Sequence, residues 1–219
     1  MKVAASVATA AAESAAAESA AAESARAAGF TTMSKEKYQK QWEAISHKIE
    51  KANSELLCLT YGSLVSQLLK DFEQVEAVNA QLEKMGYNIG VRLVDEFLAK
   101  ANIGACESFR ETAEVIAKLG LRMFLGVSGE VVATGRDDRS FSLILHANPL
   151  ADFVDLPHSL SSLCYSNLIC GVIRGALEQL RMRVSCYFVK DMLKGDDVYE
   201  IRLELKELMK EEFQDDDDA

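Results

Sequence analysis

Cys106 stands at the start of a segment that could hold a long apolar ligand. The residues that follow it at helical spacing would share one face of a helix: Phe109, Ala113, Ile116, Gly120 and Met123. Ala113, Ala117 and Gly120 are small where a packed core usually carries Leu or Ile. A thiol at the mouth of a groove lined by small residues is a place where a thin apolar chain could lie. An ordinary core helix with a buried structural cysteine fits the same spacing, so both interpretations stay open.

The composition indicates one folded, acidic protein with reduced thiols. The chain has 219 residues, of which 49% are hydrophobic, enough for one substantial core. Its net charge of −10 argues against duplex nucleic acid as a partner, because binding to phosphates requires a basic surface. The five cysteines are odd in number, none has CxxC spacing, and only three histidines are present. We therefore expect no metal site and the reduced cysteines typical of the cytosol.

Three segments of different character follow one another along the chain. The sequence AAAES occurs three times between residues 10 and 24, with a five-residue period that gives no continuous apolar face on a helix. We therefore expect residues 1–33 to be a disordered low-complexity segment. A single domain is expected over 34–213 and an acidic tail over 214–219. No apolar stretch is long enough for a transmembrane helix.

The period of the hydrophobic residues changes from 3.6 to 2 near residue 126. Helices are expected over 34–51, 54–72, 75–101, 106–125 and 160–180, with Asn53-Ser54 as the cap of the second. A hairpin is expected over 126–146, and two further strands over 184–188 and 199–205. The buried side of the last helix is expected to carry Ile169, Val172, Ile173, Ala176 and Leu180. This order predicts an α+β fold, with helices packed on one face of a twisted antiparallel sheet.

The sequence shows no signature of a catalytic centre. It contains no GxxxxGK[ST] phosphate loop, no GxGxxG after a strand, no HExxH and no GxSxG elbow. His47, His146 and His158 lie far apart, and none forms an obvious catalytic pair with an acidic residue or a cysteine. We therefore expect no catalytic residues and a protein that is not an enzyme.

Five ordered motifs carry a family resemblance. They are LTYGSLVSQLLKDF (59–72), MGYNIGVRLVDEFLAKANIGACESF (85–109), FSLILHANPLADFVDLP (141–157), YSNLICGVIRGALE (165–178) and FVKDMLKGD (188–196). Together they closely resemble the Bet-type small subunits of TRAPP, the transport protein particle. The resemblance implies a non-catalytic subunit of a complex that tethers vesicles between the endoplasmic reticulum and the Golgi apparatus. It also implies a contribution to guanine nucleotide exchange on a Rab GTPase.

The resemblance also assigns roles to particular residues. The acylated cysteine of the family falls on Cys106, whose palmitate would be the only cofactor. Its chain would lie in an internal channel lined by Phe109, Ala113, Ile116, Ala117, Gly120 and Met123. Contact with the GTPase is expected from Glu211, Glu212 and Phe213. The implied partners are other TRAPP small subunits, in heterodimers or homodimers, and the implied location is cytoplasmic and peripheral at cis-Golgi and endoplasmic reticulum membranes.

Two departures from the family bear on acylation. Ala105 stands where a basic residue is common, and Glu107 follows the cysteine directly. Because a nearby cation favours the thiolate, we expect weaker self-acylation by a lipid thioester. A stand-alone carrier of lipids or small ligands is the alternative function. A cysteine-dependent acyltransferase would need a base near Cys106 that the sequence does not show.

Overall fold

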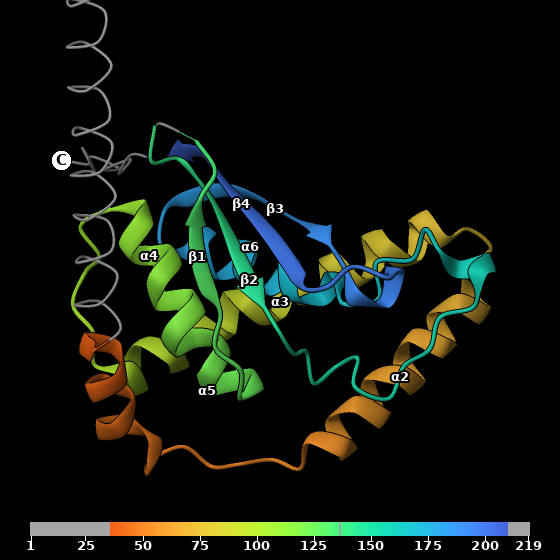
Figure 1. The fold of residues 1–219 in the computed structure, drawn as a ribbon, viewed down its shortest axis with the longest axis horizontal. Coiled ribbons are helices and arrows are strands. Elements are labelled where there is room, and N and C mark those ends of the chain that lie inside the picture. Colours follow the sequence, from red (N-terminus) through yellow and green to blue (C-terminus); the bar gives the residue numbers. More distant parts are fainter. Residues whose placement is uncertain (1–35, 136, 210–219) are drawn as a thin grey trace, which may run out of the picture. The chain divides into compact units, whose positions relative to one another are not determined.

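The structure is a computed structural model that describes residues 36–135 and 137–209. Its contacts divide the chain into two units, residues 1–43 and residues 44–219. The described part of the first unit, residues 36–43, belongs to a helix that runs from 36 to 46. The second unit contains the sheet and the helices that cover it (Figure 1).

Two long helices occur where the sequence predicts them. Helix α2 spans Ser54–Asp71, and the side chain of Asn53 caps it by accepting a hydrogen bond of 2.8 Å from the amide of Leu56. Helix α3 spans Val75–Ala101 and ends where Asn102 takes a left-handed conformation, with φ 48° and ψ 47°. Both expected ranges and the Asn53 cap are thus confirmed.

The segment from 106 to 125 differs from the single α-helix that the spacing predicts. Helix α4 (Phe109–Val115) starts three residues later, a π-helical turn, η1 (Ile116–Gly120), follows it, and α5 (Leu121–Leu125) completes the run. The prediction of a continuous α-helix from Cys106 is therefore wrong. A π turn places more residues in each turn than an α-helix, so side chains beyond residue 116 do not occupy the positions that a 3.6-residue period gives them.

Within residues 36–135 and 137–209, four antiparallel strands form one sheet in the order β1-β2-β4-β3. The strands are β1 (Glu130–Ala133), β2 (Ser140–Leu145), β3 (Met182–Lys190) and β4 (Tyr199–Leu208). Alternate residues of the two central strands point into the core and are almost fully buried: Phe141, Leu143 and Leu145 on β2, and Tyr199, Ile201 and Leu203 on β4. Helices α3, α4 and α6 lie on that side of the sheet (Figure 1). The predicted α+β fold is confirmed.

Helix α6 (Asn167–Gln179) begins seven residues later than predicted. The segment before it holds a short 3-10 turn, η2 (His158–Leu160). The side chain of Asn79 on α3 holds this segment in place, because it donates to the carbonyl of Ser162 at 3.0 Å and accepts from the amide of Cys164 at 2.8 Å. The backbone carbonyl of Asn79 also accepts from the side chain of Asn167 at 2.9 Å. These long-range bonds fix an irregular backbone for which the apolar pattern alone predicts helix.

Helices α3 and α6 touch backbone to backbone through four glycines. A Cβ atom placed on Gly86 or Gly90 would lie 2.1 Å from a carbonyl oxygen of α6. One placed on Gly171 or Gly175 would lie 2.1 or 2.3 Å from a carbonyl oxygen of α3. The buried side of α6 therefore includes Gly171 and Gly175, which the prediction omits, whereas the predicted Leu180 is 39% exposed.

Candidate functional site

Cys106 lies in the loop 102–108 between α3 and α4, where its side chain is half-buried. The loop is held by the cap of α4. The hydroxyl of Ser108 accepts from the amide of Glu111 at 3.1 Å, and the carboxylate of Glu111 accepts from the amide of Glu107 at 2.9 Å. This reciprocal cap fixes the backbone of the residue next to Cys106. The five cysteines of the chain form no disulfide in the described residues.

The first residues after the loop anchor it to the sheet. Phe109 is buried, and its ring centroid lies 5.7 Å from that of Phe141 on β2. Ala113 and Ala117 are fully buried and belong to the same hydrophobic core cluster. Along the helical segment 109–125, the next member of this cluster is Leu121, four residues beyond Ala117. The side that joins the core thus repeats every fourth residue, as a run with a π turn requires.

The three remaining residues of the expected channel lining lie outside that row. Ile116 is partly buried and packs against the cluster, Gly120 is partly buried, and Met123 is buried without belonging to the cluster. The structure therefore joins Phe109 and Ala113 to Ala117 in one row and sets the other three residues apart from it.

Two hydrogen bonds join the π turn to the segment before β1. The carbonyl of Ala117 accepts a hydrogen bond of 2.8 Å from the amide of Gly129, just before β1. The ammonium group of Lys118 donates to the carbonyl of the same glycine. A Cβ at Gly129 would lie 2.9 Å from the side chain of Leu145 and 3.2 Å from the carbonyl oxygen of Ile144, so the neighbours would have to shift. The helix widens where the start of β1 binds to it.

Space remains beside Gly120. A Cβ atom built on this residue would meet only the carbonyl oxygen of Val115 within 4 Å, at 3.9 Å. At Gly86 on α3 the corresponding atom would come within 2.1 Å of the neighbouring backbone. Gly120, which is partly buried, is therefore small without being required by a close contact.

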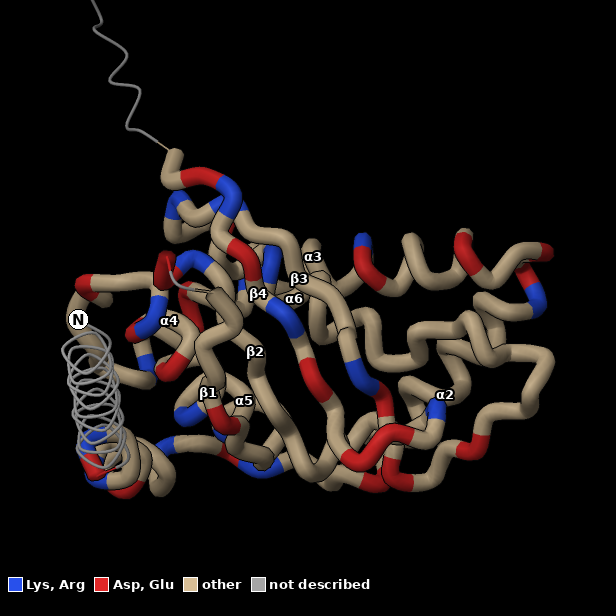
Figure 2. Tube along the Cα trace, turned by 45° about the horizontal axis from the view of Figure 1, so that its top comes forward, with Lys and Arg blue, Asp and Glu red and all other residues tan. Residues whose placement is uncertain are grey.

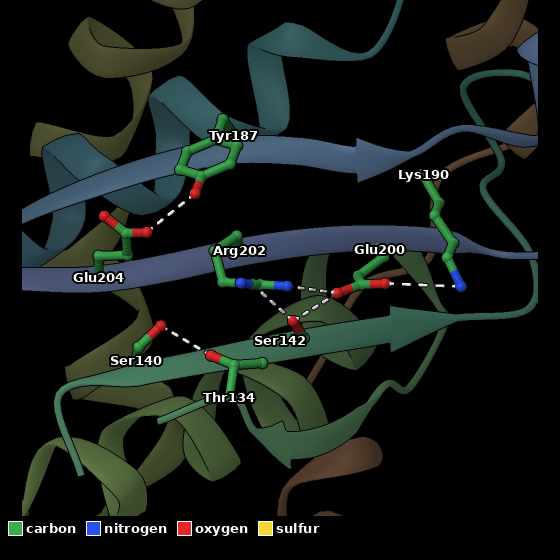
Figure 3. A network of polar contacts seen from close by, with 8 residues as sticks. All are labelled: Thr134, Ser140, Ser142, Tyr187, Lys190, Glu200, Arg202 and Glu204. Atoms are coloured by element: carbon green, nitrogen blue, oxygen red, sulfur yellow. Dashed lines mark hydrogen bonds and ion pairs between the residues drawn. The ribbon is translucent and has the colours of Figure 1, made fainter. Parts of the chain in front are cut away.

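A polar network on the outer face of the sheet escaped the sequence analysis (Figure 3). Ser142 donates to the carboxylate of Glu200 at 2.6 Å, and Arg202 donates to both, at 2.9 Å to Ser142 and 3.0 Å to Glu200. The Ser142 hydroxyl and the Arg202 guanidinium hold the pKa of Glu200 below its usual value. Lys190 adds an ion pair at 3.8 Å. The alternation of acidic and basic residues along β4 is the signal that could have revealed it (Figure 2).

This network links strands β2, β3 and β4 through side chains. The hydroxyl of Ser142 and one carboxylate oxygen of Glu200 are occupied by bonds within the network, and the lowered pKa of Glu200 makes it a weak base. Elsewhere among residues 36–135 and 137–209, no group of three or more His, Cys, Asp or Glu side chains could hold a metal ion. No described helix is long and apolar enough to cross a bilayer.

Helix α2 exposes several large apolar side chains. Leu56 and Leu59 are each 65% exposed, and Leu57 is 41% exposed. Large apolar side chains gathered on one helix mark a surface that a partner can cover. The residues expected to contact the GTPase, Glu211, Glu212 and Phe213, lie outside the described residues.

Comparison with known proteins places these features in a family. Residues 57–204 match the model of the transport protein particle (TRAPP) component. The chain is 53% identical over 178 residues to trafficking protein particle complex subunit 3 of Dictyostelium discoideum, a match that covers 81% of this chain and 95% of the relative. It is 50% identical over 172 residues to transport protein particle subunit bet3 of Schizosaccharomyces pombe, a match that covers 78% and 93%.

A solved structure is similarly close. The crystal structure of trafficking protein particle complex subunit 3 from Naegleria fowleri, covalently bound to palmitic acid, is 54% identical. The match has a TM-score of 0.71 and covers 74% of this chain and all of that chain. On the family model, the sequence identity and this structural match, the chain belongs to the TRAPP component family as a homologue of its subunit 3.

Proposed function

We propose that this chain is a non-catalytic core subunit of the TRAPP vesicle-tethering complex and that a palmitoyl group on Cys106 lies in an internal channel. The observation that carries the acyl part is the covalent palmitic acid in the relative from Naegleria fowleri. The position of Cys106 supports it: the thiol is half-buried, directly before a helical run that packs on the sheet.

The path of the acyl chain follows from where space remains. Ala113 and Ala117 are fully buried within the core cluster, whereas no close contact requires Gly120 to be small. We infer that the chain runs from Cys106 along the helical run toward Gly120. Ile116 and Met123, on the same run, border this path, and Phe109 closes it on the side of the sheet.

A lipid held inside the protein acts as part of its core. Burial of each CH₂ group contributes about 0.8 kcal/mol, so a palmitoyl chain represents roughly 10 kcal/mol of apolar burial. If the acyl chain is buried in the channel and not in the bilayer, this burial stabilises the folded protein. The lipid would then contribute little to membrane binding, and location at cis-Golgi and endoplasmic reticulum membranes would depend on the assembled complex.

Native mass spectrometry before and after hydroxylamine, which cleaves thioesters, tests the acyl group directly. We expect one palmitoyl mass that hydroxylamine removes and that Cys106→Ser lacks. Thermal unfolding should show a higher midpoint for the acylated parent than for Cys106→Ser. Equal midpoints for a fully acylated parent and the serine variant would contradict a structural lipid, and a lipid retained in Cys106→Ser would contradict the thioester.

The exposed leucines of α2 support a subunit rather than a stand-alone carrier. We propose that Leu56, Leu57 and Leu59 contact another TRAPP small subunit. Leu59→Lys should then reduce co-purification of other small subunits without loss of the fold. Glu73→Lys, a change at an exposed residue outside this surface, is the control. Elution of the parent as a single chain with exchangeable lipid, in cells that contain the other subunits, would favour the carrier.

The acidic end of the chain is proposed to contribute to nucleotide exchange on a Rab GTPase. Negative charge from Glu211 and Glu212 near a nucleotide pocket would repel phosphate and favour release, and Phe213 would add apolar contact. Truncation after Lys210 should slow exchange by the assembled complex while assembly stays intact. An unchanged exchange rate would remove these residues from the mechanism.

A further inference from the structure

The residues that follow Cys106 in the sequence carry more negative than positive charge. Glu107 is exposed and directly follows the cysteine, and Glu111 is held close by because its carboxylate accepts from the amide of Glu107 at 2.9 Å. The single basic residue between 105 and 111 is Arg110, which is half-buried with its Nε below the surface. One negative charge thus lies on the residue that follows the thiol, and a second is held at the backbone of that residue.

We propose that Glu107 and Glu111 restrain acyl transfer to Cys106 from polyanionic acyl donors such as acyl-coenzyme A, an inference that rests on the proposed acylation of this cysteine. In the reaction the Cys106 thiol loses its proton to solvent and the thiolate attacks the thioester carbonyl. A new carbon–sulfur bond forms, the bond to the donor sulfur breaks, and the departing thiolate takes up a proton. The acyl group is exchanged between two sulfur atoms, and nothing is oxidised or reduced.

Two steps of this reaction are sensitive to the carboxylates. A neighbouring negative charge disfavours the thiolate that attacks, and it repels the phosphates of the donor as they approach. Both effects act through solvent, so salt should weaken them. The hydrogen bond from the Glu107 amide keeps the Glu111 carboxylate beside the residue that follows the cysteine.

The variants Glu107→Gln and Glu111→Gln test the proposal. The side chain introduced by Glu111→Gln keeps an oxygen that accepts from the amide of Glu107, so the cap of α4 is retained while the charge is removed. Glu73→Gln is the matched control, because it removes one exposed negative charge ahead of α3. The 27 residues of α3 separate it from the Cys106 loop, a distance of about 40 Å along the helix axis. Cys106→Ser reports labelling at other residues.

Hydroxylamine-treated protein is incubated either with palmitoyl-coenzyme A or with an uncharged N-acetylcysteamine palmitoyl thioester. Mass spectrometry then follows the rate of acylation. We expect each of the two changes near Cys106 to raise the rate with palmitoyl-coenzyme A about fivefold at low ionic strength. The increase should be smaller with the uncharged donor and smaller at high salt. Glu73→Gln should match the parent.

The outcomes separate this inference from the proposed function. Acylation of Cys106 at rates within twofold of the parent in both Glu107→Gln and Glu111→Gln would overturn the inference and leave the acylated subunit intact. Equal acceleration by Glu73→Gln would overturn it too, because the effect would then come from net charge. Absence of acyl transfer to Cys106 in the parent and every variant would overturn both. Acylation seen only after removal of a carboxylate would support the inference in its strongest form.

Discussion

The contact between α3 and α6 predicts that one added methyl group will destabilise the fold. In Gly171→Ala the new Cβ atom would lie 2.1 Å from the carbonyl oxygen of Glu83 and 2.8 Å from the amide nitrogen of Tyr87. Both are backbone atoms of a long helix, so no side chain can rotate away. A normal contact of about 3.5 Å requires the two helices to separate locally by about 1.4 Å.

The cost follows from what surrounds this contact. Separation by 1 Å removes about a quarter to a half of the dispersion energy of the atoms involved, and overpacking of a tight core costs about 1–3 kcal/mol. Alanine is preferred to glycine in a helix by about 1 kcal/mol, which offsets part of this. We expect a net destabilisation of about 2 kcal/mol, which lowers the unfolding midpoint of a domain of this size by about 4–8 °C.

Circular dichroism melts of hydroxylamine-treated protein measure this effect without a contribution from the lipid. Gly120→Ala is the control, because it adds the same methyl group within a helical run, at φ −60° and ψ −58°, with only the Val115 carbonyl oxygen near it. It should leave stability unchanged or raise it by up to about 1 kcal/mol. A Gly171→Ala protein as stable as Gly120→Ala would refute the argument from backbone contact.

Three further predictions concern other parts of the fold. The lowered pKa of Glu200 means that its bonds stabilise the fold above the usual carboxyl pKa and are lost as the pH falls through the folded value. Ser142→Ala should therefore cost about 2 kcal/mol at pH 7, and urea unfolding should show the difference shrinking below about pH 4. Asn53→Ala should cost about 1 kcal/mol through loss of the α2 cap, whereas Asn53→Asp should not; equal losses would exclude the cap as the cause. Gly120→Leu should lower the fraction of protein that retains palmitate while the unacylated form still folds, and full retention by mass spectrometry would show that the chain takes another path.

The sequence was sufficient where local interactions decide the structure. The bounds of α2 and α3, the Asn53 cap and the alternation on β4 follow from patterns within about twenty residues. The start of α6 could not be found this way, because Asn79 fixes the preceding loop from 85 residues away. The π turn was equally hidden, since it depends on a bond between Ala117 and Gly129 that requires β1 to be in place.

The candidate site was predicted only in part, for the same physical reason. The sequence motif singles out Cys106, but it predicts a helix where the structure has the loop 102–108, and the row that joins the core depends on the π turn. The channel lining remains a prediction. The bond between Ser142 and Glu200 could not be predicted either, because it depends on the pairing of β2 with β4.

Small residues serve two opposite purposes in this chain, and composition cannot distinguish them. At Gly86 and Gly171 the missing side chain lets two backbones touch, so an added atom must push the helices apart. At Gly120 an added Cβ atom would meet nothing beyond its own helical turn except the carbonyl oxygen of Val115, at 3.9 Å. A glycine that lets two helices pack closely is explained by that contact. A helical glycine without such a contact lowers helix stability by about 1 kcal/mol relative to alanine, and no packing contact offsets this loss. No close contact explains Gly120, so the proposed path of an acyl chain from Cys106 gives this glycine a reason that the contacts within the fold do not supply.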